Sequence, residues 1–117
     1  MKNADERRNR YLRDTLPIRM GGLAANLARV NSFAVHPGGK DAVAGLIEES
    51  KYFIEWTAIE FDISTATELV GIQRRLAQWH RNIDSIWKDE NLRLAIGLEA
   101  KDISNRLLAK SGLLNQK

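Results

Sequence analysis

The first candidates for chemistry in this sequence are His80 and the arginine five positions before it, Arg75. Histidine is the side chain that most readily gains and loses a proton near neutral pH. The chain holds 2 histidines among many basic residues, so a pair at this spacing arises easily by chance. We therefore favour a simpler interpretation, in which His80 lies at the edge of an apolar stripe and bonds a neighbour or solvent.

The spacing of these two residues nevertheless resembles a known signature. The segment Arg75-Leu76-Ala77-Gln78-Trp79-His80 is similar to the R-x4-6-H motif of HEPN-type ribonucleases, which are also helical bundles. The resemblance implies that Arg75 and His80 would form the RNA-cleaving pair across a dimer cleft. The polar residue usual after the arginine is here Leu76, and no other part of the chain resembles that family. A HEPN-like ribonuclease is thus the enzymatic alternative.

Other kinds of catalytic or metal site have little support. Di-iron bundles need Glu-x-x-His pairs, but Ala77 stands three residues before His80, and Phe33 three before His36. The chain has no cysteine, so it has no disulfide, thiolate metal site or thiol nucleophile. No serine or threonine has a neighbouring base at a recognisable spacing. We expect no metal site, no cofactor and no enzymatic activity.

Nucleic-acid binding is a second alternative. Arg74, Arg81 and Lys88 recur at seven-residue spacing on one helical face, and four arginines lie between residues 7 and 13. No aromatic residues are interleaved with the row, so bases have no stacking platform there. Residues 41–62 carry a net negative charge, and an acidic helix could lie beside the basic ones. We therefore favour solvated or internally paired charges over a nucleic-acid surface.

The apolar pattern predicts the helices that must position these residues. From Glu68 to about Lys88 the large apolar residues recur every three or four positions, as expected for an α-helix packed lengthwise on others. They are Leu69, Ile72, Leu76, Trp79, Ile83 and Ile86. Similar stripes predict helices from Thr15 to Ala34, from Asp41 to Phe61 and after Asn91. We expect Asp41 to cap the second helix, and Thr65 with Glu68 to form a capping box.

Four helices with short connections predict an all-α fold, an up-and-down antiparallel four-helix bundle with a charged N-terminal arm. Residues 1–14 form the arm or a short helix, residues 15–112 the bundle domain, and residues 113–117 a C-terminal tail. Trp79 belongs to the core, and Trp87 closes one end of the bundle with its indole N–H on a polar partner.

The predicted helix from Asp41 to Phe61 has apolar residues on two opposite faces. Tyr52, Trp56 and Ile59 lie opposite the core face, and such a stripe should not stay in water. Three covers stay open: the arm with Tyr11 and Leu12, the final Leu113-Leu114, or a second copy of the protein. We weigh cover from within the chain and a homodimer equally, and place a ligand groove third.

Three segments also resemble small, uncharacterised cyanobacterial-type all-helical proteins, a group that carries no known activity. They are Arg10–Pro17, Gly22–Arg29 and Leu46–Thr57. The chain has no apolar run of the ~20 residues that a membrane span needs, and no apolar segment follows its charged start. We therefore expect a cytoplasmic, non-enzymatic helical protein that acts by protein–protein interaction, as a homodimer or with a protein partner, and away from membranes.

Overall fold

The computed structural model describes residues 2–111, and the side chains from residue 5 onward. Within this range the chain folds into six α-helices and one 3-10 turn, with no strand. The elements are α1 (Lys2–Leu12), α2 (Leu16–Ala34), α3 (Lys40–Thr57), η1 (Ala58–Glu60), α4 (Ile63–Arg81), α5 (Ile83–Lys88) and α6 (Glu90–Ser111). The predicted all-α class is confirmed. The four-helix bundle is not confirmed, because six helices form.

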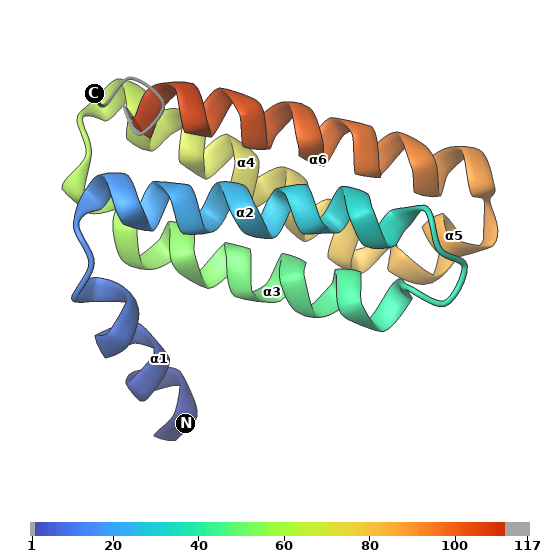
Figure 1. Cartoon of the computed structure of the whole chain (residues 1–117), viewed down its shortest axis with the longest axis horizontal. Helices are drawn as coiled ribbons and strands as arrows, with labels where there is room; N and C mark the ends of the chain where they lie inside the picture. Colours follow the sequence, from blue (N-terminus) through green and yellow to red (C-terminus); the bar gives the residue numbers. More distant parts are fainter. Residues whose placement is uncertain (1, 112–117) are drawn as a thin grey trace.

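The four long helices α2, α3, α4 and α6 lie side by side, and successive ones run in opposite directions (Figure 1). Helix α2 packs closely against both α6 and α3, and α3 packs in turn against α4. Helix α1 leaves the others at an angle and contacts α3 (Figure 1). The predicted C-terminal tail, residues 113–117 with Leu113-Leu114, lies outside the described residues.

The helix starts follow local capping chemistry. Thr15 precedes α2, and Pro17 lies in its first turn, as predicted, where the missing N–H of proline costs no hydrogen bond. Helix α3 begins one residue before the predicted cap Asp41, with Gly39 at the N-cap. The predicted capping box is wrong: Asp62 caps α4 by accepting from the Thr65 N–H at 3.3 Å, and Glu68 pairs with Lys110.

The predicted continuous helix from Glu68 to Lys88 is broken at Asn82. Helix α4 ends at Arg81, and α5 begins at Ile83. The Asn82 side-chain amide donates to the Gln78 carbonyl at 2.9 Å, so it competes for a helical acceptor. The apolar periodicity does not reveal this break, because the stripe of apolar residues continues from α4 into α5 and Ile86 stays buried.

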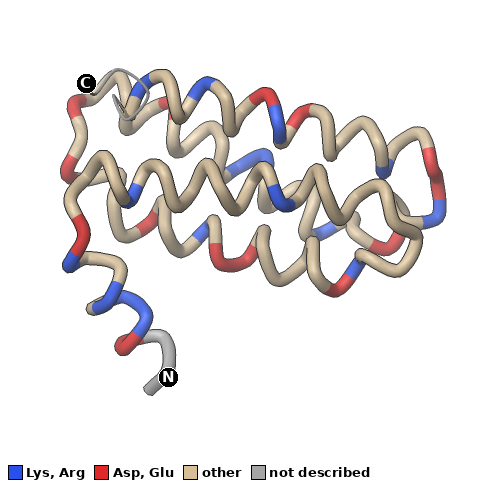
Figure 2. Tube along the Cα trace, in the orientation of Figure 1, with Lys and Arg blue, Asp and Glu red and all other residues tan. Residues whose placement is uncertain are grey.

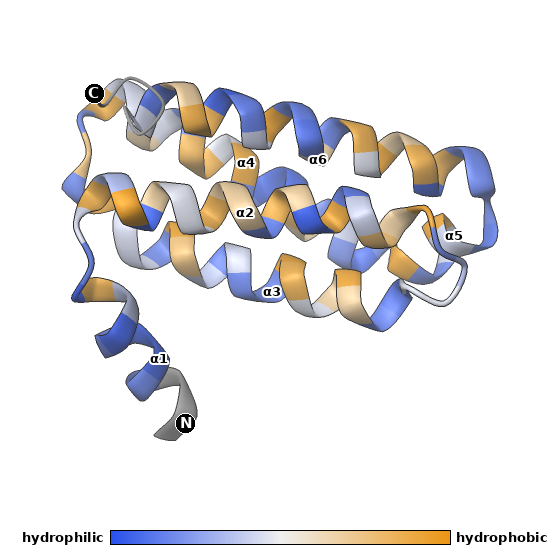
Figure 3. Cartoon of the chain, in the orientation of Figure 1, coloured by the Kyte–Doolittle hydropathy of each residue, from blue (hydrophilic) through white to orange (hydrophobic). Residues whose placement is uncertain are grey.

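The predicted apolar stripes form the core. Leu69, Ile72, Leu76 and Trp79 of α4 are all buried, and they face the buried residues of α2, α3 and α6. Hydrophobic and hydrophilic residues alternate along the long helices, whereas the described part of α1 is mostly hydrophilic (Figure 3). The core thus lies between the four long helices, and α1 remains outside it.

Helices α2 and α6 pack closely against each other. A Cβ atom added at Gly97 of α6 would lie 2.9 Å from both the Ala34 Cβ and the Asn31 Oδ1 of α2. Ser104 of α6 donates its buried hydroxyl to the Ala24 carbonyl at 2.7 Å. Small residues at these positions allow the two backbones to approach.

Charges are dispersed over the long helices and denser on α1 (Figure 2). Among residues 2–111 no helix is both long and apolar enough to cross a membrane.

The close approach at Gly97 yields a stability prediction. We expect Gly97→Ala to lower the free energy of unfolding by about 1–2 kcal/mol, because overpacking costs more than the helix propensity gained. Gly71→Ala is the matched control, since Gly71 is exposed on α4 with nothing within 4 Å of an added Cβ. That change should raise stability by up to about 1 kcal/mol. Urea unfolding of both variants tests the difference, and equal effects would contradict the close packing.

Candidate functional site

Four aromatic side chains gather where α1 meets α3. Tyr11 of α1 stacks on Phe53 of α3, with ring centroids 4.0 Å apart and an angle of 11° between the planes. Its centroid lies 5.9 Å from that of Trp56, and Tyr52 stacks on Trp56 at 5.5 Å. We call Tyr11, Tyr52, Phe53 and Trp56 the aromatic cluster. The predicted stripe is therefore covered in part from within the chain, at Trp56.

Tyr11 fastens α1 to the rest of the molecule. Its hydroxyl donates to the Arg19 carbonyl at 3.1 Å, and Arg19 Nε donates to the Asp14 carbonyl at 2.9 Å. Burial raises the pKa of Tyr11 to about 12, because ionisation would place a charge among apolar rings. A loose ion pair also links the two helices, with Arg7 Nη1 at 4.0 Å from Glu49 Oε2. Tyr11 thus combines ring stacking and a hydrogen bond in its attachment of α1 to the other helices.

Arg19 also joins α2 to the end of α3. Its side chain is 6% exposed, and both terminal nitrogens donate to the Glu60 carboxylate in η1. This bidentate hydrogen bond lowers the pKa of Glu60 and raises that of Arg19. The same guanidinium therefore holds η1, α2 and the end of α1 together.

Two isoleucines next to this junction are almost fully in solvent. Ile59 is 90% exposed in η1, and Ile63 is 85% exposed at the start of α4. Tyr52, seven residues before Ile59 on α3, remains 37% exposed. We call Tyr52, Ile59 and Ile63 the apolar corner. It contains two of the three predicted interface residues, and the third, Trp56, lies between Tyr52 and Tyr11.

The structure does not bring Arg75 and His80 together within one chain. Arg75 makes a bidentate pair with Glu99 of α6, at 2.7 and 2.9 Å, and its guanidinium carbon lies 5.5 Å from the Trp79 ring. This pairing raises the pKa of Arg75. His80 faces α3 instead, where its Nδ1 lies 3.5 Å from Lys51 Nζ.

His80 lies on a small groove of about 270 Å³ between α3 and α4. Its other lining residues are Glu48, Lys51, Tyr52, Glu55 and Gln73. The Gln73 side chain donates to the Lys51 carbonyl at 3.1 Å and fixes the groove's floor. Groups of three or more potential metal ligands are absent from the described part of the chain. The groove thus places His80 and Lys51 beside two glutamates, and Arg75 is not among its lining residues.

The predicted basic row lies on the surface. Arg74 and Arg81 are exposed on α4 and Lys88 on α5, and none of the three belongs to an ion pair of the described residues. The break at Asn82 separates Lys88 from the first two, so the row does not follow a single helix. Anions can therefore reach these side chains, but no aromatic ring of the described residues stacks on any of the three.

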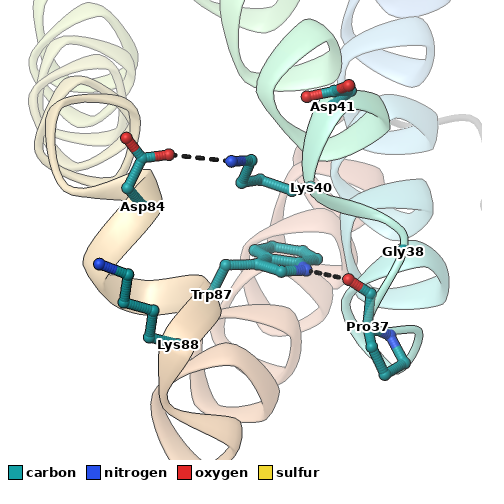
Figure 4. Close-up of a pocket in the computed structure, with 7 residues that line it drawn as sticks. All are labelled: Pro37, Gly38, Lys40, Asp41, Asp84, Trp87 and Lys88. Atoms are coloured by element: carbon teal, nitrogen blue, oxygen red, sulfur yellow. Dashed lines mark hydrogen bonds and ion pairs between the residues drawn. The ribbon is translucent and has the colours of Figure 1, made fainter.

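A second groove, of about 630 Å³, lies between α5 and the α2–α3 loop (Figure 4). On one side the Trp87 indole N–H donates to the Pro37 carbonyl at 2.7 Å, which confirms the polar partner predicted for this residue. Above it Lys40 Nζ pairs with Asp84 at 3.1 Å (Figure 4). Lys88 and Asp41 complete the rim, so two cations and two anions offset each other. This charge balance favours no strongly charged ligand.

In comparisons with protein-family models, curated proteins and solved structures, this chain matches none. The resemblances to HEPN-type ribonucleases and to cyanobacterial-type helical proteins therefore stay predictions. Sequence reasoning missed Ile63 and the pairing of Arg19 with Glu60. An isoleucine directly after the helix cap Asp62 is the signal by which Ile63 could have been recognised.

The raised pKa of Tyr11 predicts a pH dependence. Because the folded state holds this proton more tightly than the unfolded chain does, Tyr11 docking should be complete below about pH 10, the ordinary tyrosine pKa. Stability should then fall as the pH rises from there to about 12. Tyrosinate absorbance in a Tyr52→Phe background follows Tyr11 alone. Tyr11→Phe is the control and should lose this step; an unshifted titration would show that the ring is not buried.

Proposed function

We propose that this protein is a non-enzymatic interaction protein that associates with a second copy of itself through the apolar corner. The observation that carries the proposal is the near-complete exposure of Ile59 and Ile63, which stand four residues apart where η1 leads into α4. Large apolar side chains grouped on a surface mark a contact site, because covering them removes apolar area from water.

The junction behind the corner supports this role. Arg19 and Glu60 hold η1 against α2, so Ile59 is displayed from a fixed backbone rather than from a free loop. A rigid display lowers the entropy lost on association. The four long antiparallel helices then act as one scaffold for the surface, in the manner of a four-helix bundle.

The charges favour a second copy over an unrelated partner. Exposed carboxylates on α3, at Glu48 and Glu55, lie near the corner, and α1 presents exposed arginines at Arg7, Arg8 and Arg10. A two-fold arrangement lets each copy offer its basic helix to the acidic side of the other. Both halves of a complementary contact are thus present on one chain.

Light scattering on Ile59→Glu tests the proposal. Because Ile59 is exposed, the change should leave the helical content and the melting temperature nearly unaltered, while the charge abolishes the dimer. Leu98→Glu is the matched control: Leu98 is 68% exposed on α6, away from the corner, and its variant should dimerise as the wild type does. A monomeric wild type, or equal loss of dimer in both variants, would contradict the proposal.

A further inference from the structure

We propose that α1 is exchanged between the two copies of the dimer, so that Tyr11 of each chain completes the aromatic cluster of the other. The inference rests on the proposed self-association and names its partner segment. Exchange of an identical element is a low-cost route to a dimer, because every contact of the closed monomer is made again between chains.

The first observation is that α1 is a poorly attached helix. Among its described side chains, those of residues 5–10 are all exposed, and those of Tyr11 and Leu12 near its end are half-buried. An 11-residue helix is too short to be stable alone in water, so α1 depends on a docking site. That site is Phe53 and Trp56 of α3, and a second copy carries the same site.

The second observation is the short hinge between α1 and α2. Three residues, 13–15, separate α1 from α2. Arg13 and Asp14 donate their N–H groups back to Arg10 and Tyr11, so both would move with α1. Pro17 prevents the two helices from fusing, because proline inside a helix removes a hydrogen bond and clashes with the preceding turn. The change of direction is therefore confined to the backbone near Thr15.

The third observation is where this hinge lies. Arg19 Nε donates to the Asp14 carbonyl at 2.9 Å, and the two terminal nitrogens of the same side chain donate to the Glu60 carboxylate. The hinge is thus adjacent to η1 and to Ile59. Two copies joined at the apolar corner bring their hinges close to one another, which is the geometry that a short linker needs for exchange.

Cross-linking between two different single-cysteine chains tests the exchange, and the native chain has no cysteine to interfere. Arg7→Cys and Glu49→Cys remove a loose surface ion pair, which contributes little to stability. Glu49→Cys also removes the acceptor of the buried Asn26 side-chain amide, so its melting temperature is measured to verify that this chain is folded. Equal amounts of the two chains, one isotopically heavy, are incubated at dimer-forming concentration and treated with a short bis-maleimide. Exchange predicts a mixed product that joins position 7 of one chain to position 49 of the other. It also predicts that a chain carrying both cysteines cross-links between chains rather than within one chain, which an unexchanged dimer does not.

Arg29→Cys in place of Arg7→Cys is the matched control, since Arg29 is an exposed α2 residue outside every ion pair of the described residues. It should give no mixed product. A dimer that yields no mixed 7–49 product, while the double-cysteine chain closes on itself, would overturn the exchange and leave self-association intact. A wild type that scatters light as a monomer would overturn both.

Tyr11→Ala provides an independent readout by light scattering. If α1 joins the two copies, removing its anchor should raise the dimer Kd about tenfold or more, whereas Tyr11→Phe, which keeps the ring, should change it little. If α1 only covers Phe53 and Trp56 within its own chain, Tyr11→Ala uncovers apolar surface and leaves the dimer equal or tighter. That second result would overturn the exchange.

Discussion

The structure depends on helix α2 being packed on two sides at once. Its larger apolar residues, among them Leu23, Leu27 and Val30, are buried in the common core, and its small residues lie against α6. Close approach is possible only because Gly97 has no side chain and Ser104 returns a hydrogen bond to the α2 backbone. The dispersion energy of this contact grows steeply as the backbones approach. The remaining long helices then bury their own stripes around this pair.

Both ends of α2 are tied to neighbouring elements by an arginine. At its start Arg19 bonds the Asp14 carbonyl and Glu60, and at its end buried Arg93 of α6 donates to the Ala34 carbonyl at 2.8 Å. The last carbonyls of a helix lack intrahelical donors, so the Arg93 hydrogen bond to Ala34 replaces one that water would supply. Arg19 also holds η1 against α2, and it thereby fixes the backbone next to the exposed isoleucines.

The sequence predicts the elements that depend on repeated patterns. Leu69, Ile72, Leu76 and Trp79 recur at helical spacing, so their burial follows from periodicity alone. The break at Asn82 does not, because one side-chain amide decides it and the apolar stripe continues beyond it. The capping of α4 shows the same limit: Asp62, Thr65 and Glu68 all fit a helix start, and only the tertiary pairing of Glu68 with Lys110 separates them.

The sequence predicts the candidate surface only in part. The helical angle of Tyr52, Trp56 and Ile59 indicates a second apolar face, but it does not indicate which residue is covered. That outcome depends on Tyr11, which lies more than forty residues earlier and reaches Phe53 through the turn at residues 13–15. Trp56 gains shelter because it is beside Phe53, whereas Ile59 lies beyond the reach of α1 and remains in solvent. A single aromatic anchor therefore divides one apolar stripe into a part satisfied within the chain and a part that still requires a cover.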